Sequence, residues 1–470
     1  MFARPPILSA LPFRWFSVAS APRRDTPPVL NFAASLPMSD PIPNAAVSSA
    51  PATPGAREVV NVRTFGARGD GSVDDAPAFN AAFAAVRAAT RYPAGAAPVY
   101  APAGIYRLDS PVNMTAASLN LVGDGMVQTV LLGNTGRGRC VLDMTGAAFS
   151  SVRELSIYTH AEGPRPVLVP NPSSYGVVWI RHASLQSAEM NRLERVHVSM
   201  HTDAAANGGH GTLALYDCCG EVSSVRGCYL RGDSAVLLAG ENVTRFASTY
   251  TPTQAGGSSM SVFEADRDTY LVGLARAAVA IHGGASFRID SHLTNQYDQS
   301  TPAARSAGLP LRAPYPYAVE VAGQVHDLYL GGVVEAFPVS LGVIRSLVRG
   351  LRYHHHHAHG VGRSNVWLDG AEVLNSVFQP VPASGNYDTA GYLVECAAER
   401  PSKIFTSEIF AYGNQGLRSR NRSAAAEVTA CRIFTDQPLK DFVLDFPTAR
   451  GNMISSPTGT SINGVMVWPC

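Results

Sequence analysis

A short strand pattern of the form x-V-x-L, followed by a turn, recurs along most of this chain. Successive repeats start about 20 to 43 residues apart, the shortest spacing being close to one coil of a solenoid and the longer ones requiring inserted loops. Helical periodicity is nearly absent after residue 90. We therefore expect an all-β chain in which distant strands stack in parallel around an apolar interior. The repeats are VVWIRH (177–182), TLALYD (212–217), AVLLAG (235–240), AVAIHG (278–283), AVEVAG (318–323), PVSLGV (338–343), NVWLDG (365–370) and GYLVEC (391–396).

The outward positions of these repeats predict a shallow groove. If the Val and Leu of each repeat point inward, alternation along a strand sends the residues between and after them outward. The middle of the resulting columns holds small residues, with aromatic and ionic groups at its flanks. This register places His282 one rung from Ala322 and brings Glu320 close to His282 diagonally. Long insertions at 159–175 and 295–317 would build a wall along one edge of the groove.

Charge and cysteine content exclude several classes of partner. The 37 Lys+Arg residues against 36 Asp+Glu leave a formal charge of +1, which removes any general electrostatic case for binding nucleic acid or an anionic membrane. No run of eighteen uncharged apolar residues occurs, so we expect no membrane span. Seven cysteines are too sparse, and too odd in number, for a disulfide scaffold. We expect buried thiols, no metal site and no cofactor.

Residues 1–58 differ in composition from the rest of the chain. They hold 11 of the 33 prolines and no sustained apolar period, so we expect a disordered or anchoring segment. The small residues Ala19-Ser20-Ala21 resemble a signal-peptidase site, although Pro12 and Arg14 interrupt the apolar region before it. An export signal, a transit peptide, an anchoring tail and a true start at Met38 all remain open, so the sequence does not decide whether residues 1–37 belong to the mature protein.

A strand, a glycine turn and a helix open the folded part of the chain. Gly66, Gly69 and Gly71 form the turn, and Asp74 or Asp75 can cap a helix that starts near Ala76. The apolar residues Phe79, Phe83 and Val86 follow at helical spacing, which gives this helix one buried face.

This opening resembles a known family. FGARGDGSVDDAPAFNAAF followed by VYAPAGIYRL is similar to the start of the pectate-lyase-like right-handed β-helix proteins, which include phage tailspikes and bacterial polysaccharide depolymerases. The resemblance covers about residues 60–125. It implies a right-handed parallel β-helix whose N-terminal helix caps the solenoid, with residues 59–125 as the opening module and 126–470 as the helix with its inserted loops. The resemblance supplies no catalytic residue, because the motif series of polygalacturonase-type hydrolases is not found in order.

Four polar residues gather around the longest inserted loop and form our predicted acid/base set. Asp290 and His292 are two residues apart in FRIDSHL, hence on one face of a strand. Glu320 lies on the repeat after the loop, and Glu335 ends LYLGGVVEAF. Hydrolysis of a glycan needs two carboxyl groups about 5 to 9.5 Å apart, whereas β-elimination needs a base beside a uronate carboxylate. The sequence leaves both reactions open.

Aromatic and charged residues along the repeats are the predicted substrate contacts. Sugar rings stack their apolar faces on aromatic side chains and direct their hydroxyls to polar groups. The residues of this kind on the repeats are Trp179, Arg181, Tyr216, His282 and Trp367.

We expect a secreted enzyme or phage tailspike that binds and cleaves an extracellular polysaccharide, as a glycoside hydrolase or a polysaccharide lyase. The alternative is a catalytically silent adhesin or virion fibre of the same fold. A tailspike would be a homotrimer, and a secreted enzyme would more often be a monomer.

Overall fold

The structure is a computed structural model of the 470-residue chain. The chain divides into two units, Met1–Ala56 and Arg57–Cys470. All described residues belong to the second unit, so the expectations for residues 1–58 lie outside the described part. The structure describes residues 59–467 except 90–96, 116–117, 136–139, 160–177, 182–187, 200–212, 219, 240–260, 275, 296–315, 360–363, 381–391, 413–415, 437, 439–442, 458 and 463–464.

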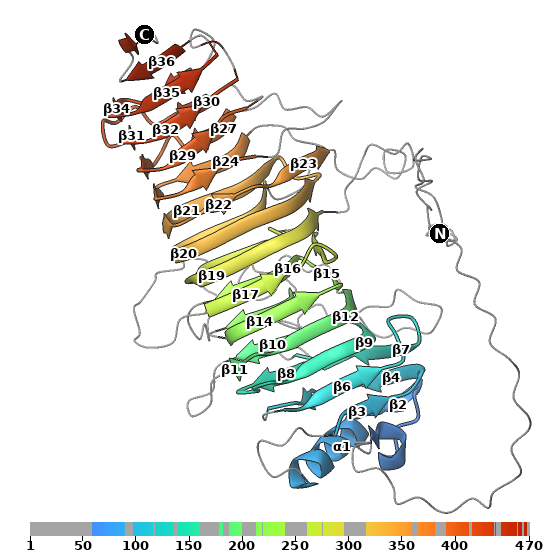
Figure 1. Ribbon diagram of the computed structural model, residues 1–470. Coiled ribbons are helices and arrows are strands. Elements are labelled where there is room, and N and C mark those ends of the chain that lie inside the picture. Colours follow the sequence, from blue (N-terminus) through green and yellow to red (C-terminus); the bar gives the residue numbers. More distant parts are fainter. Residues whose placement is uncertain are drawn as a thin grey trace, which may run out of the picture. The chain divides into compact units, whose positions relative to one another are not determined.

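The described part of this unit is built almost entirely of strands, which confirms the all-β prediction. All strands before β36 pair in parallel with strands from neighbouring turns of the chain, so the sheet grows coil by coil (Figure 1). The longest pair is β19 (Val279–Thr294) and β20 (Tyr317–Glu335), which stay together from Val279 opposite Val319 to Thr294 opposite Glu335. His282 pairs with Ala322, as the repeat register predicts.

The sequence repeats form one continuous ladder of parallel strands, which we call the repeat ladder. Its central members are β19, β20 and β21, which pair in the AVAIHG, AVEVAG and PVSLGV segments. The ladder runs through β8 (Leu142–Thr145), β10 (Val178–Arg181), β13 (Leu213–Cys218), β16 (Ser234–Ala239), β19, β20, β21 (Val339–Arg349), β24 (Ser364–Asp369), β27 (Tyr392–Cys396) and β30 (Gly416–Ser419).

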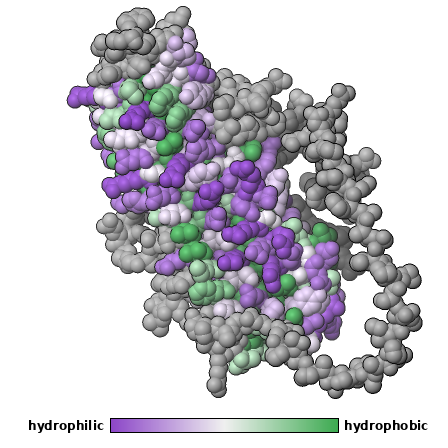
Figure 2. Space-filling model, viewed as in Figure 1, coloured by the Kyte–Doolittle hydropathy of each residue, from purple (hydrophilic) through white to green (hydrophobic). Residues whose placement is uncertain are grey.

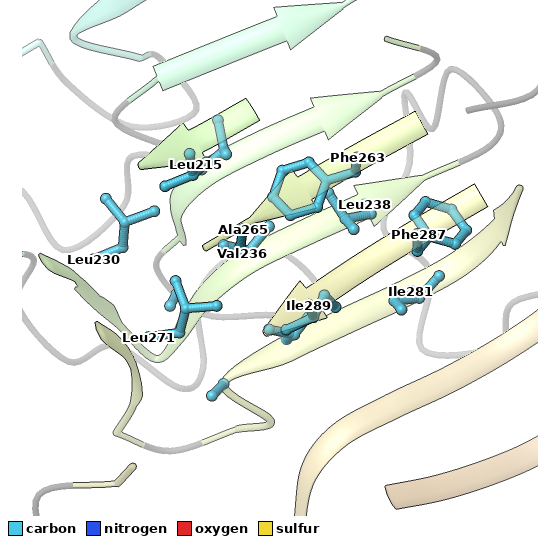
Figure 3. Close-up of a cluster of buried hydrophobic side chains, with 14 of the residues drawn as sticks. Leu215, Leu230, Val236, Leu238, Phe263, Ala265, Leu271, Ile281, Phe287 and Ile289 are labelled. Atoms are coloured by element: carbon cyan, nitrogen blue, oxygen red, sulfur yellow. The ribbon is translucent and has the colours of Figure 1, made fainter. Parts of the chain in front are cut away.

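Alternation along the strands fills the interior with apolar side chains. Val236 stacks on Val279 and then on Val319, while Phe263 of β17 (Ser261–Ala265) stacks on Phe287, and all five are fully or almost fully buried. Figure 3 shows such residues converging from strands on different sides of the coil. Burial of this area is the main force that holds one coil on the next.

At one bend of successive coils, within or between strands, residues with left-handed backbone conformation stack on one another. Ser286, Asp327, Asn375 and Thr406 have φ between 47° and 61°, although none is glycine. Serines that follow these residues accept hydrogen bonds from buried backbone amides of the adjacent coil. For example, Ser376 Oγ accepts the amide hydrogen of Leu351 at 3.1 Å. The same arrangement repeats one coil further on, where Ser407 Oγ accepts from the amide of Ser376 at 3.2 Å.

Helix α1 (Ala76–Ala89) lies beside the first strands, at the blue end of the stack (Figure 1). It begins at the predicted residue, and Asp74 Oδ1 accepts the amide hydrogen of Ala76 at 3.0 Å. Phe79, Phe83 and Val86 are buried, as the spacing predicts. The helix contacts β1 (Val60–Asn61), β3 (Val99–Ala101), β4 (Gly104–Leu108) and β5 (Val112–Asn113).

The last strands depart from the parallel arrangement expected for residues 126–470. Strand β35 (Met453–Ser456) pairs antiparallel with β36 (Gly459–Ile462), which pairs antiparallel with β37 (Val465–Val467). Only two residues connect β35 to β36, and so short a connection can join only antiparallel strands.

Candidate functional site

Aromatic rings stack along the outer surface of five successive coils, and we call this feature the aromatic ladder. Its ring centroids are 5.3 Å apart for Tyr158 and His197, 4.7 Å for His197 and Tyr229, 6.4 Å for Tyr229 and Tyr270, and 4.6 Å for Tyr270 and His292. Strand register produces the series from His197 to His292, because His197 pairs with Tyr229, Tyr229 with Tyr270, and Tyr270 with His292. At about 4.8 Å for each rung, the ladder extends about 19 Å along the stack.

The aromatic ladder ends at a histidine that contacts a carboxylate. His292 Nε2 lies 2.8 Å from Glu335 Oε2, and both side chains are about one quarter exposed. When Nε2 carries the proton, Glu335 accepts that hydrogen bond and the Nδ1 lone pair is left as a base. Two of the four residues predicted for acid/base chemistry are thus in direct contact.

Asp290 lies on the same outer face as His292 but is engaged by two arginines. Arg267 places a guanidinium nitrogen 3.4 and 3.3 Å from the two carboxylate oxygens, and an Arg288 nitrogen lies 3.8 Å from one of them. Arg288 also lies over the Tyr329 ring, 4.5 Å from its centroid. Only glycine fits at position 331 without a shift of these side chains, since a Cβ there would lie 2.7 Å from the Tyr329 hydroxyl and 2.8 Å from Asp290 Oδ1. Hydrophilic side chains gather on the face of the stack drawn in Figure 2.

Glu320, the fourth predicted residue, is not part of this group. It lies on the repeat ladder between Ala280 and Gly342, at the opposite end of β20 from Glu335. Burial raises the pKa of Glu320 from 4.5 to about 7. Burial also lowers the pKa of His282, on the neighbouring coil, from 6.5 to about 4, so this imidazole is neutral near pH 7.

The predicted substrate contacts all belong to the repeat ladder. Tyr216 and His282 are buried there, at 3% and 6% exposure. Trp367 is half-buried; the guanidinium of Arg420 lies 5.7 Å from its ring centroid. Strand β10 carries Trp179 and Arg181, whose side chains lie outside what the structure describes. These five residues therefore lie on a different ladder from the contact between His292 and Glu335.

Sequence reasoning missed the tyrosines of the aromatic ladder, although a signal was present. The segment YLRG (229–232) recurs as YLVG (270–273), and its two tyrosines are the ones that stack. It also missed Arg267 and Arg288, because nothing in their local sequence ties them to Asp290.

The described residues lack two further kinds of feature. They contain no group of three or more His, Cys, Asp or Glu side chains arranged to hold a metal ion. They also contain no helix with the length and apolar character needed to cross a membrane.

The opening of the chain matches a known family model. Residues 59–159 match the family described as Rhamnogalacturonase A/epimerase, pectate lyase-like, which confirms the resemblance inferred from the opening motif. Mannuronan C5-epimerase AlgE1 of Azotobacter vinelandii is 38% identical over 98 residues, which are 19% of this chain and 7% of that protein. The chain thus spans less than a tenth of the length of the curated relatives it matches.

Solved structures align over more of the chain at low identity. The A-module of Mannuronan C-5 epimerase AlgE6 from Azotobacter vinelandii has a TM-score of 0.42 and 16% identity, over 84% of this chain and 99% of that one. The enzymatically active domain of tailspike protein 2 from bacteriophage CBA120 has a TM-score of 0.43 and 10% identity, over 75% of this chain and 47% of that one.

Proposed function

We propose that this protein binds a polysaccharide along the aromatic ladder and acts on it where the ladder ends, at His292 and Glu335. The observation that carries the proposal is the 2.8 Å contact between these two side chains at the last ring of the stacked series. The stacked rings present a row of aromatic edges and tyrosine hydroxyl groups along which a sugar chain can lie, and Tyr270 is 44% exposed. A histidine oriented by a carboxylate is the usual arrangement of a general base.

The chemistry we propose is removal of the proton beside the carboxyl group of a uronate, with His292 Nδ1 as the base. The electron pair left on C5 can expel the glycosidic oxygen at C4, which forms a C4=C5 double bond and requires a proton for the leaving oxygen. It can instead take a proton on the opposite face, which inverts C5. The first outcome is a lyase reaction and the second an epimerase reaction, and both begin with the same step.

Hydrolysis is less well supported by the same geometry. A hydrolase needs one carboxyl group held protonated beside a second carboxylate. Here Glu335 contacts His292, and Asp290 contacts two guanidinium groups, so each carboxylate faces a nitrogen group and not a second carboxyl group. Glu320 has the raised pKa of an acid, but the nearest carboxylate along its column, that of Glu395, is three rungs away, or about 14 Å.

The relatives agree with a uronate polymer as the substrate class. AlgE1 is named for mannuronan, and the family description includes an epimerase. We propose the same class for this chain, with a right-handed parallel β-helix capped by α1 as its scaffold. Right-handed crossovers are nearly universal between parallel strands. An extracellular or virion location, with a homotrimer in the virion case, belongs to the same proposal.

The test is turnover of uronate polymers by His292→Gln and Glu335→Gln variants, with His326→Gln as the control. His326 is a half-buried histidine of β20 that pairs with Ala285, on the other side of the bend at Asp327 from Glu335. Absorbance of unsaturated uronates reports elimination, and uptake of deuterium from solvent at C5 reports epimerisation.

We expect each site variant to lose at least a hundredfold in rate while the control keeps wild-type activity. Full activity in His292→Gln would refute the assignment. Binding of the polymer by the wild-type protein without any turnover would favour the non-catalytic adhesin or fibre.

A further inference from the structure

A hollow on the outer surface, which we call the corner pocket, lies at a bend that three coils share. It is lined by side chains of Asp327 from β20, Arg349 at the end of β21, Arg352 of β22 (Arg352–Tyr353) and Asn375 from the following coil. Val377 supplies an apolar part of its wall, while Leu351 beneath it is fully buried in the core. Arg349 and Arg352 are both exposed.

The two arginines of the corner pocket differ from the other arginines near the aromatic ladder. Arg267 and Arg288 both contact Asp290. Within the described part of the chain, neither the Arg349 nor the Arg352 guanidinium donates a hydrogen bond or forms an ion pair, and the Asp327 carboxylate has no such partner either. Two guanidinium groups on either side of one hollow are thus available to a ligand.

The backbone holds these groups apart and leaves space between them. Asp327, Gly350 and Asn375 stack in the left-handed region at φ of 52°, 71° and 49°. A Cβ at Gly350 would lie 2.7 Å from Asp327 Oδ1, so glycine keeps the floor of the hollow open. Asn375 Oδ1 accepts a hydrogen bond from Thr406 Oγ1 at 2.5 Å, which orients its amide group.

We propose that the corner pocket binds one acidic sugar residue of a polysaccharide, through the carboxylate of a uronate. Arg349 and Arg352 would bind the carboxylate, since guanidinium groups match carboxylate geometry. The Asp327 carboxylate, which repels a simple anion, would accept hydrogen bonds from sugar hydroxyls. Val377 would pack against the apolar face of the ring. This combination of cations, one carboxylate and apolar surface fits an acidic sugar better than it fits inorganic phosphate or sulfate.

The pocket lies close enough to the aromatic ladder to bind the same polymer chain. Arg352 pairs with Tyr329 on β20, the strand that ends at Glu335. His292 pairs with Val333, four residues beyond Tyr329. The backbones of His292 and Arg352 are thus two rungs and four strand residues apart, which corresponds to about 16 Å. The inference deepens the proposed function by assigning an anchoring subsite, yet it can be tested without any turnover.

Binding of oligogalacturonate and oligomannuronate to the full chain tests this proposal by calorimetry, with a neutral glucan oligosaccharide and sodium sulfate as comparison ligands. The site variant is Arg349→Gln/Arg352→Gln. The control is Arg345→Gln, because Arg345 is an exposed arginine of the same strand that also makes no ion pair with a described residue and lies at another bend. The His292→Gln variant is included because its loss of turnover leaves the corner pocket intact.

We expect the double variant to lose at least tenfold in affinity for one of the two uronate oligomers, and the control to match wild type. Asp327→Asn should weaken uronate binding and strengthen sulfate binding, because it removes both an acceptor and a negative charge. Unchanged uronate affinity in the double variant would overturn the proposal, as would equal affinity for the neutral glucan. If His292→Gln and wild type both lack turnover but bind uronate through the arginines, the proposed reaction fails and the subsite stands.

Discussion

Glu320 offers a quantitative test of how the repeat ladder buries charge. The side chain lies between Ala280 and Gly342, and burial raises its pKa from 4.5 to about 7. The folded protein therefore holds this proton more tightly than the unfolded chain does. Stability falls as the pH rises from about 4.5 to about 7, and the loss is complete above the folded pKa. With about 1.4 kcal/mol for each unit of pKa difference, the ionised side chain costs the folded state about 3 kcal/mol.

Glu320→Gln removes the titration and should change the pH dependence of stability. At pH 4 the variant and the wild type should differ little, because the wild-type carboxyl is neutral in the folded state. At pH 8 the variant should be more stable by up to about 3 kcal/mol. The measurement is urea unfolding of both proteins at half-unit steps from pH 4 to pH 8, followed by far-UV circular dichroism.

A matched control separates this effect from general charge removal. Glu372 is half-exposed, with one oxygen 3.5 Å from the Lys403 ammonium, so Glu372→Gln should alter stability by less than about 1 kcal/mol. A difference between Glu320→Gln and wild type that stays constant from pH 4 to pH 8 would refute the reasoning. It would mean that Glu320 remains solvated and ionised in the folded protein.

Two further substitutions test the core and the bends. Phe287→Ala removes a ring that is 1% exposed and should lower the free energy of unfolding by about 3 to 5 kcal/mol, whereas Phe287→Leu should cost less; equal losses would contradict close packing at that coil. Ser376→Ala leaves the amide hydrogen of Leu351 without its acceptor and should cost about 1 to 3 kcal/mol in urea unfolding. A neutral result there would show that the stacked serines do not support the bend.

The strand repeats predict the stacking correctly but leave its register ambiguous. His282 pairs with Ala322 as expected, because AVAIHG and AVEVAG align in only one obvious way. In TLALYD both Leu213 and Leu215 can take the inward position, and a slip by two residues keeps every side chain on the same face. Tyr216 therefore pairs with Trp179, whereas aligning VVWIRH with TLALYD residue by residue would place it opposite Arg181.

The candidate site was predicted only in part, because the strand residues alone do not show where a coil bends. The sequence placed Glu320 and Glu335 together since both lie near the longest loop. In the structure they occupy opposite ends of β20, which has left-handed residues between them at Gly323, Asp327 and Gly332, with φ of 78°, 52° and 83°. Glycine suits this conformation, but few other residues adopt it, so residue type does not mark the bend at Asp327. The contact of His292 with Glu335 depends on these bends and on the register of two coils.

In the proposed function, the reaction takes place at the ring that ends the aromatic ladder, His292. On the next coil the position opposite His292 is Val333, so no ring covers His292 from that side. Glu335 lies two residues further on and is opposite Thr294, and its side chain reaches diagonally back to the imidazole. A ring within the series, such as Tyr270, has an aromatic neighbour on each side. A sugar chain lying along the tyrosines would therefore meet, at His292, a base that a carboxylate orients and that no ring of the series covers from the far side.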